Sequence, residues 1–287
     1  MLSYRLCLLV GAIATVVGQN SEQELNDAIQ DLVLSFGDSL FQGPSSFTGV
    51  KLSSWDERSG VNPEELGDYP EGDILFPRQQ SEPMSRNSLR TARRWKRGIV
   101  PYVIAGSFSY EERSLIQQAF ADFAKETCVR FVRRTAEPDY LMITSDSSGC
   151  WSSVGKNGGA QQLNLQRSGC VTTKGTVVHE LMHALGFLHE QNRWERDDYV
   201  TIRYQNIQPG LAYNFEKASR SSTDGLGIDY DYGSVMHYSE YAFSSNQMPT
   251  IVAKKSGVRM GQRSGFSPSD IKKIRRLYKC NKGKSYV

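Results

Sequence analysis

Residues 179–190 read HELMHALGFLHE and hold three of the chain's four histidines, His179, His183 and His189. His179 and His183 are four residues apart, so on an α-helix they lie on one face, one turn apart. Gly186 follows, and because glycine adopts left-handed dihedral angles cheaply, the chain can turn there and bring His189 back. Three neutral imidazoles arranged in this way can hold a zinc ion and leave one ligand position open for water. The stretch therefore predicts a helix that ends at Gly186 and carries a metal centre.

Glu180 lies between the first two histidines, where it cannot easily reach the same metal. It can instead accept a proton from a water on the metal and pass it to a leaving amine. Three neutral ligands leave the metal its full positive charge, which acidifies that water. A helix with two unrelated histidines would also show HExxH. The longer pattern fixes three histidines, a glutamate and a glycine, which favours hydrolytic metal chemistry.

The charge of the chain is unevenly divided, although the formal net charge is only +3. Residues 19–86 contain 4 Lys/Arg and 13 Asp/Glu, a net charge of −9, whereas residues 87–287 contain 29 and 18, a net charge of +11. The two parts should attract each other electrostatically. No recognised motif or interleaving of basic and aromatic residues supports nucleic-acid binding, so we expect no nucleic-acid partner.

The first 18 residues have the pattern of a signal peptide. Arg5 provides the positive charge, residues 6–17 are an apolar run, and Val16 and Gly18 are small enough to precede a cleavage site. A short membrane anchor is the alternative, but the run is too short to span comfortably, so we expect no membrane span. A secreted, extracellular protein is predicted.

Five cysteines are present, and Cys7 would leave with the signal peptide. The other four can form disulfides in three pairings, and none shows CxxC spacing, which makes disulfides favoured over a second zinc site. These four are Cys128, Cys150, Cys170 and Cys280.

Residues 19–86 are polar and acidic, with one amphipathic stretch over residues 24–36, and we interpret them as a propeptide. Within them, YPEGD (residues 69–73) places Asp73 after a glycine, from where its carboxylate could reach the zinc. The residues alone favour an ordinary acidic turn there. Basic residues follow from Arg86 to Arg97, where trypsin-like cleavage is plausible.

Apolar patterning then predicts a globular domain. Ser109 and Glu112 form a capping box that opens a helix. We expect strands at 99–104, 128–132 and 140–144, a turn at 149–151, an edge strand at 161–166, and helices at 173–188 and 267–278. Four cations on the last helix, Lys272, Lys273, Arg275 and Arg276, fit a solvated face, with a polyanion site as the sharper alternative.

Two further features identify a family. Glu190 directly follows the third histidine, and SVMHY (234–238) stands about 45 residues later. Supporting stretches are SGCWSSVG (148–155), GAQQLNL (159–165) and RWERDDYVTI (193–202). Over roughly residues 87 to 280 the sequence resembles the astacins, within the metzincin zinc peptidases. The resemblance implies an α+β fold with two lobes: a mixed sheet with the active-site helix, an irregular C-terminal lobe, and zinc in the cleft between them.

The resemblance also implies roles for individual residues. His179, His183 and His189 would bind one Zn²⁺ per chain, with Glu180 as the general base. Met236 would lie beneath the metal. Tyr238 would ligate zinc at rest and then swing away to hydrogen-bond the oxyanion, a role that suits a phenol.

Activation and the disulfides follow from the same resemblance. Asp73 would hold the zinc in the zymogen, so the resemblance reverses the preference for a simple turn. Cleavage by an activating protease would fall near Arg86, making Asn87 the mature start, and Glu190 would meet the new N-terminus. The pairings would be Cys128–Cys280 and Cys150–Cys170.

The predicted organisation is therefore a signal peptide (1–18), a propeptide (19–86) and a catalytic domain (87–287) that acts as a monomeric zinc endopeptidase. Only seven residues follow Cys280, so we expect no further module. A peptide substrate would lie extended along residues 161–166, and its expected contacts are Trp151, Gln161, Gln162, Leu163 and Asn164. The alternative is a catalytically inactive protein that binds peptides in the same cleft.

Overall fold

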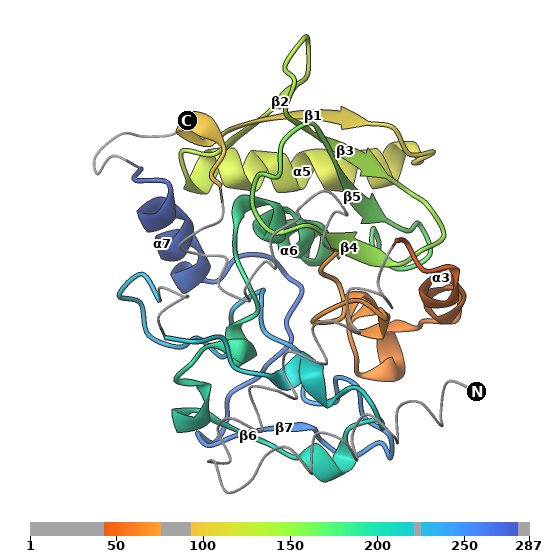
Figure 1. Cartoon of the computed structure of the whole chain (residues 1–287), viewed down its shortest axis with the longest axis vertical. Coiled ribbons are helices and arrows are strands. Elements are labelled where there is room, and N and C mark those ends of the chain that lie inside the picture. The colour runs from red at the N-terminus through yellow and green to blue at the C-terminus, as the bar shows by residue number, and fades with distance from the viewer. Residues whose placement is uncertain (1–42, 76–92, 221–224, 281–287) are drawn as a thin grey trace, which may run out of the picture. The chain divides into compact units, whose positions relative to one another are not determined.

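The computed structural model describes residues 43–75, 93–220 and 225–280 (Figure 1). The predicted signal peptide, the amphipathic stretch 24–36 and the predicted cleavage at Arg86–Asn87 lie outside the described residues. The helices are α3 (Ser46–Ser53), α5 (Tyr110–Glu126), α6 (Lys174–Leu185) and α7 (Pro268–Leu277). The strands are β1 (Ile99–Ile104), β2 (Arg130–Arg133), β3 (Tyr140–Thr144), β4 (Cys150–Ser152), β5 (Ala160–Leu165), β6 (Val200–Ile202) and β7 (Ile251–Ala253). Short 3₁₀ helices are η1 (Glu57–Ser59), η2 (Pro63–Leu66), η3 (Lys96–Gly98), η4 (Glu190–Asn192), η5 (Arg196–Asp198), η6 (Tyr204–Asn206) and η7 (Ala212–Phe215).

Five strands form a mixed sheet in the order β2-β1-β3-β5-β4. The first four are parallel, and β4 runs antiparallel to β5. Two predictions are wrong here. The stretch expected as an edge strand, 161–166, belongs to the interior strand β5, and the stretch expected as a turn forms the true edge, β4. Of the predicted turn, Gly149 alone lies outside the strand, and its φ of 92° suits glycine, whereas Cys150 and Trp151 belong to β4.

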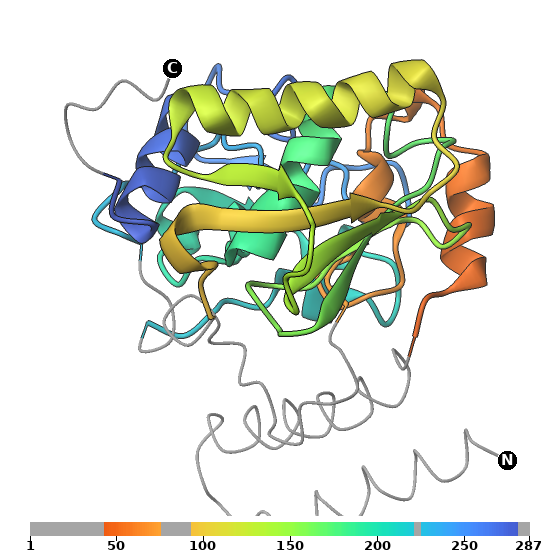
Figure 2. The same ribbon diagram turned by 90° about the horizontal axis from the view of Figure 1, so that it is seen from above.

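Helix α5 begins at the predicted capping box, where Ser109 and Glu112 satisfy each other's backbone N–H groups. Its apolar face is buried through Ile116, Phe120 and Phe123. This face packs with α6 against the sheet, and Figure 2 shows α5 lying across the strands. Because α6 is covered by α5, the sheet and the second half of the chain, it is buried all round.

Two separate apolar cores define two lobes. The larger core joins the sheet, α5, α6 and α7, and Met236 belongs to it. The smaller core surrounds the two-stranded sheet β6-β7 and includes Phe215, Tyr238 and Ile251. Helix α6 ends at Leu185, before Gly186, which lies in the left-handed region at φ 109° as the glycine pattern predicted. The range expected for this helix, 173–188, therefore ran three residues too far. The chain then passes from the first lobe to the second.

The N-terminal segment, which we define as residues 43–75, packs on the edge of the sheet. Ser152 N donates to Asp73 O at 2.9 Å and Leu75 N donates to Ser152 O at 3.0 Å, so the segment adds a short parallel bridge to β4. The Tyr69 hydroxyl donates to Ser148 O at 2.6 Å, and its ring packs against Trp151. No helix among the described residues is both long and apolar enough to cross a membrane.

The structure contains the disulfides Cys128–Cys280 and Cys150–Cys170, which close loops of very different size. In the chain-entropy view, a cross-link over 152 residues restricts the unfolded chain more than one over 20 residues. We therefore expect Cys128→Ala/Cys280→Ala to lower the free energy of unfolding by about 5 kcal/mol, and Cys150→Ala/Cys170→Ala by about 3 kcal/mol. Urea unfolding of the two double variants tests the order. The reverse order would mean that native contacts around β4, rather than loop entropy, dominate.

Candidate metal centre

The three histidines of the opening stretch meet at one buried point. His179 and His183 come from α6, and His189 comes from the segment after Gly186. In each, the Nδ1 atom faces an acceptor: Val235 O at 2.7 Å, Phe187 O at 2.8 Å and Glu71 Oε2 at 2.8 Å, respectively. These acceptors place the hydrogen on Nδ1, which leaves each Nε2 as a lone-pair donor aimed inward.

The inward nitrogens stand at the spacing of ligands around a single ion. His179 Nε2 lies 3.1 Å from His183 Nε2 and 3.2 Å from His189 Nε2. Tetrahedral zinc with Zn–N bonds of about 2.1 Å needs nitrogens about 3.4 Å apart. Lone pairs do not bond one another, so a shared cation is what this arrangement fits.

Asp73 of the N-terminal segment supplies the fourth ligand atom. Its Oδ2 lies 2.9 Å from His179 Nε2 and 3.3 Å from His189 Nε2, and its Oδ1 lies 3.3 Å from His183 Nε2. Oδ1 is buried and has no hydrogen-bond partner. All four side chains are buried, and their ligand atoms lie within 4.8 Å of one another. The donor set of three imidazoles and one carboxylate fits zinc.

Electrostatics at the centre favour a bound cation. Burial lowers the pKa of His179 to about 3, which keeps that imidazole neutral and able to ligate. Burial opposes charge on Asp73 as well, but the imidazoles of His189 and His183 outweigh it and hold the pKa of Asp73 well below its usual value. Burial lowers the pKa of His189, but the carboxylates of Asp73 and Glu71 outweigh burial and raise it to about 9. The buried carboxylates thus favour a positive charge at this point, which a metal ion can provide in place of a proton on His189.

Glu180 is fully buried next to this cluster, and neither of its carboxylate oxygens has a hydrogen-bond partner. Burial raises its pKa well above the usual value, and the nearby carboxylates of Asp73 and Glu64 raise it further. A carboxyl group of raised pKa can hold a proton near neutral pH, as proton transfer requires. An unpartnered buried group of this kind is typical of a functional site.

The segment Ser234–Tyr238 lies against two of the histidines, through Val235 O on His179 and the Tyr238 ring on His189. Asp270 at the start of α7 accepts from Ser234 Oγ at 2.6 Å and from Val235 N at 2.9 Å, which fixes the turn. The Tyr238 ring lies 4.6 Å from the His189 ring, and its hydroxyl donates to Glu71 O at 2.5 Å. Burial raises the pKa of Tyr238 well above its usual value, so the phenol keeps its proton.

Four carboxylates of the N-terminal segment are tied to the centre or to its rim. Besides Asp73, Glu71 bonds His189. Glu65 accepts from Ser239 N and Ser239 Oγ, both at 2.6 Å, and Glu64 pairs with Arg263. Sequence reasoning found only Asp73 among them. The acidic composition of the segment was visible, but a sequence does not show which acids are buried.

Glu190, directly after the third histidine, is also buried in an ion network. Its carboxylate accepts from Lys273 Nζ at 2.5 Å, from Arg193 at 3.1 Å and from Asp231 N at 2.9 Å. Burial alone would raise its pKa, but the two cations outweigh burial and lower it. Lys273 is therefore not part of the solvated face expected for α7.

Comparison with known proteins agrees with this geometry. A family model described as Astacin (Peptidase family M12A) matches residues 87–279. The chain belongs to the astacin family. It is 44% identical over 224 residues to zinc metalloproteinase nas-4 of Caenorhabditis elegans, covering 75% of this chain and 70% of that protein. It is 48% identical over 187 residues to nas-15 of the same organism, covering 65% of this chain but only 32% of nas-15.

A solved structure supports the same fold. High choriolytic enzyme 1, a hatching-enzyme zinc protease of Oryzias latipes (medaka), matches with a TM-score of 0.61 and 43% identity, covering 66% of this chain and 94% of that chain. The predicted α+β metzincin fold is thus confirmed, and the matched region is an astacin zinc metalloendopeptidase domain with one zinc site.

The predicted substrate contacts need correction in this astacin domain. Gln161, Gln162, Leu163 and Asn164 lie in interior strand β5, whose backbone is paired on both sides. The Asn164 side-chain amide donates to Gly149 O at 2.7 Å and to Asp146 O at 2.8 Å, and the Gln161 side-chain amide donates to Gly155 O at 2.7 Å. These amide groups are therefore already bonded within the protein. Trp151 lies in edge strand β4, but its ring is buried. The edge of the sheet is β4, where residues 73–75 of the N-terminal segment cover the backbone of Ser152.

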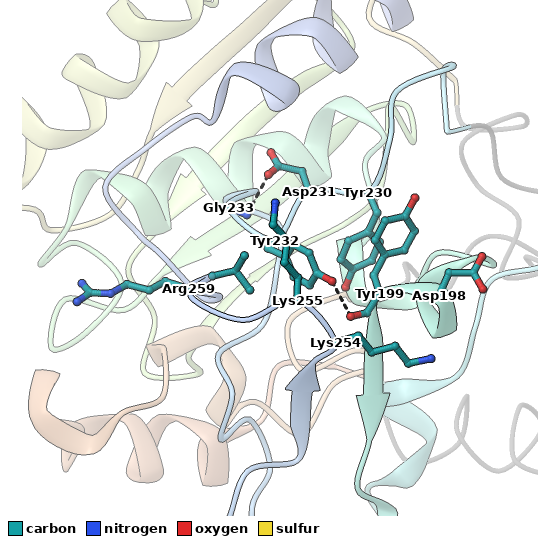
Figure 3. Close-up of a pocket in the computed structure, with 10 residues that line it drawn as sticks. Asp198, Tyr199, Tyr230, Asp231, Tyr232, Gly233, Lys254, Lys255 and Arg259 are labelled. Atoms are coloured by element: carbon teal, nitrogen blue, oxygen red, sulfur yellow. Dashed lines mark hydrogen bonds between the residues drawn. The ribbon is translucent and has the colours of Figure 1, made fainter.

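A pocket of about 710 Å³, lined by residues 231–233 among others, lies next to the Ser234–Tyr238 turn (Figure 3). Two of its three tyrosine hydroxyls are already bonded: Tyr230 bonds His237 Nε2 at 2.6 Å, and Tyr232 donates to the backbone oxygen of Tyr199 at 2.6 Å. In Figure 3 the charged ends of Asp198 and Arg259 point away from the tyrosines. These tyrosines therefore support the turn and make no second reactive site.

The Glu190 network leads to a stability prediction. Glu190→Gln leaves the ammonium group of Lys273 buried without its anion, so we expect the free energy of unfolding to fall by about 3–5 kcal/mol. Lys273→Met in the same chain should restore part of that loss, because the double variant buries no unpaired lysine. Urea unfolding of the two single variants and the double variant measures both effects. If Glu190→Gln costs under about 1 kcal/mol, the pair does not stabilise the fold.

Proposed function

We propose that this chain is a zinc-dependent endopeptidase, secreted as a zymogen in which residues 19–86 are the propeptide and Asp73 blocks the zinc. One observation carries the proposal. A carboxylate from outside the matched family domain completes the ligand set of three histidines inside it. A fourth protein ligand closes the position that a catalytic zinc site keeps open for water.

Zinc bound by His179, His183 and His189 supplies a Lewis acid that polarises a substrate carbonyl and acidifies water. Glu180, buried beside the histidines and without a hydrogen-bond partner, takes up the proton released in the attack and delivers it to the leaving amine. Tyr238 keeps its phenolic proton, so its hydroxyl can donate to the oxyanion once the N-terminal segment no longer occupies it.

The substrate backbone would add to edge strand β4 in place of residues 73–75. The N-terminal segment already uses this edge, through the bonds between Ser152 and residues Asp73 and Leu75. An exposed strand edge binds an extended peptide through backbone hydrogen bonds, largely independent of its side chains. Protein and peptide substrates are therefore the expected partners.

Activation would require an activating protease to cut near Arg86–Asn87. Glu190 is the proposed partner of the new N-terminus. In the structure its carboxylate is already bonded to Lys273 and Arg193, so an arriving amino group would join or replace one of these cations.

Secretion is proposed from the signal-peptide pattern of residues 1–18, together with two disulfides, which persist in oxidising compartments. The alternative of an inactive peptide-binding protein is not favoured, because Glu180 and Tyr238 both stand at the centre with the chemistry that hydrolysis needs.

The role of Glu180 can be separated from metal binding. After propeptide removal, Glu180→Ala should lower the rate of casein cleavage by about 10²–10⁴-fold, because no other group takes the proton. Metal analysis should still find one zinc per chain. His183→Ala should lose both zinc and activity, and a chelator should abolish the activity of the parent enzyme. Exposed Glu111→Ala serves as the matched control. Near-parental cleavage by Glu180→Ala would reject Glu180 as the base.

The basal activity of the uncut chain tests whether Asp73 blocks the zinc. In uncut chains carrying Arg86→Ala, we expect Asp73→Ala to raise basal cleavage of a quenched fluorescent peptide by at least about tenfold, because a zinc site with an open position can catalyse. Asp68→Ala, which removes a partly exposed pair with Lys51 and a hydrogen bond from Ser45 Oγ but nothing at the metal centre, is the control and should leave basal activity unchanged. Mass spectrometry verifies that the chains are uncut. An unchanged basal rate in the Asp73 variant would exclude that residue as the zinc block.

A further inference from the structure

We propose that this chain carries a binding surface for a sulfated polysaccharide, separate from the metal centre. Six exposed cations form this surface, which we call the basic face: Arg94, Lys96, Arg97, Lys272, Arg275 and Lys279. Three belong to the run around η3 and three to α7 or its end. Lys272 and Arg275 are three apart on α7 and share one side of it, and Lys279 follows just beyond the end of the helix.

A disulfide and a pair of hydrogen bonds hold the η3 segment and α7 near each other. The disulfide Cys128–Cys280 joins the end of α7 to the start of β2, and Gly98 lies against the backbone of Cys128. Trp95 Nε1 donates to Ala184 O at 2.9 Å, while the Tyr278 hydroxyl donates to Leu185 O at 3.0 Å. Both aromatic residues thus dock on the end of α6. Figures 1 and 2 both show η3 beside α7.

Little negative charge offsets the basic face. Glu126 is the one carboxylate that reaches it among the described residues, at 4.0 Å from Arg275, and it also contacts Lys125 at 3.8 Å. Across the described ranges, no ion pair involves Arg94, Lys96, Arg97, Lys272 or Lys279. Like charges on one face repel one another, and no carboxylate of the described residues pairs with these five cations. An external anion would relieve the repulsion.

Neighbouring cations behave differently. Lys273 is buried against Glu190, and Arg276 donates to Leu226 O. These two have evident structural roles within the chain. The remaining cations of α7 and η3, apart from Arg275 with its bond to Glu126 O at 2.6 Å, show no such contact. Their charges are available to a partner.

The shape and chemistry of the face favour an extended polyanion. Its cations come from two segments, and none of them lines the pocket beside the Ser234–Tyr238 turn. Ile99 is the large exposed apolar residue within this neighbourhood, so the face lacks the apolar set that inserts into a lipid surface. Trp95 is buried, which removes the stacking platform that single-stranded nucleic acid uses. A sulfated polysaccharide needs only repeated cations.

The basic face and the blocked cleft lie on different sides of α6. Figures 1 and 2 both show α7 on one side of α6 and α3 of the N-terminal segment on the other. A bound polysaccharide would therefore leave β4 and the metal centre uncovered. The site would hold the protein on an anionic matrix in both its latent and its active forms.

The test uses the full chain and heparin as the probe. Heparin binding is measured at about 0.15 M salt, where exposed charges are screened beyond about 8 Å. We expect saturable binding, and Arg94→Glu/Lys96→Glu/Arg97→Glu should weaken it at least about tenfold and reduce its salt dependence. Lys272→Glu/Lys279→Glu should act in the same direction. The matched control is Lys254→Glu/Lys255→Glu/Arg259→Glu, which changes the net charge by the same amount elsewhere and should lose far less.

Several outcomes would overturn the proposal. They are an equal loss in the control variant, equal binding of desulfated heparin, or tighter binding to anionic phospholipid vesicles or single-stranded DNA than to heparin. Urea unfolding checks the fold of each variant and should match that of the parent chain, because all of the substituted side chains of the basic face are exposed. Heparin binding does not depend on catalysis, so the proposal can fail or survive independently of the proposed peptidase activity.

Discussion

The structure depends on one electrostatic constraint: three imidazole nitrogens and one carboxylate share a single buried point. Asp73 lies 2.9–3.3 Å from all three imidazoles, and His179 Nε2 lies 3.1–3.2 Å from the inward nitrogens of the other two, so the four ligand atoms crowd within 4.8 Å of one another. A metal ion resolves this conflict, because all four groups donate electron pairs to it. Each histidine then needs its outer nitrogen anchored, and the acceptors come from α6's own end, the Ser234–Tyr238 turn and the N-terminal segment.

That constraint explains why distant segments converge. The Ser234–Tyr238 turn must present Val235 O to His179, so Asp270 of α7 fixes its backbone. Gln191 continues the same support by accepting from Tyr238 N at 3.1 Å. The two lobes therefore meet at the metal centre through hydrogen bonds rather than through one continuous apolar core. A substitution that displaces the turn or α7 would therefore also displace the histidines, because these hydrogen bonds connect them.

Much of this could be predicted where a local rule decides the structure. The spacing of His179, His183 and Gly186 predicted the helix, its end and the metal site, and the Ser109–Glu112 capping box predicted the start of α5. The edge strand could not be predicted, because alternation within 161–166 says nothing about which strands lie on either side. Tertiary pairing placed β5 inside the sheet and made the stretch expected as a turn its edge.

The burial of charged groups was equally invisible in the sequence. Glu64, Glu65 and Glu71 look like ordinary solvent-exposed acids, yet each is bonded to a group of the second half of the chain. Only the fold brings Arg263, Ser239 and His189 to meet them. Likewise, Lys273 looked like one more cation of a solvated helix face and proved to be the buried partner of Glu190.

These buried contacts bear on how the proposed zymogen would be activated. The bonds that hold residues 64–73 in place are not covalent, and none of them involves the predicted cut near residue 86. Cutting the chain there would remove none of them directly. It would only let the segment dissociate, after which each carboxylate regains its hydration and Asp73 gives up the fourth ligand position. Release of the segment, rather than the cut itself, would then open the site, because the zinc block is a ligand held in place by its neighbours.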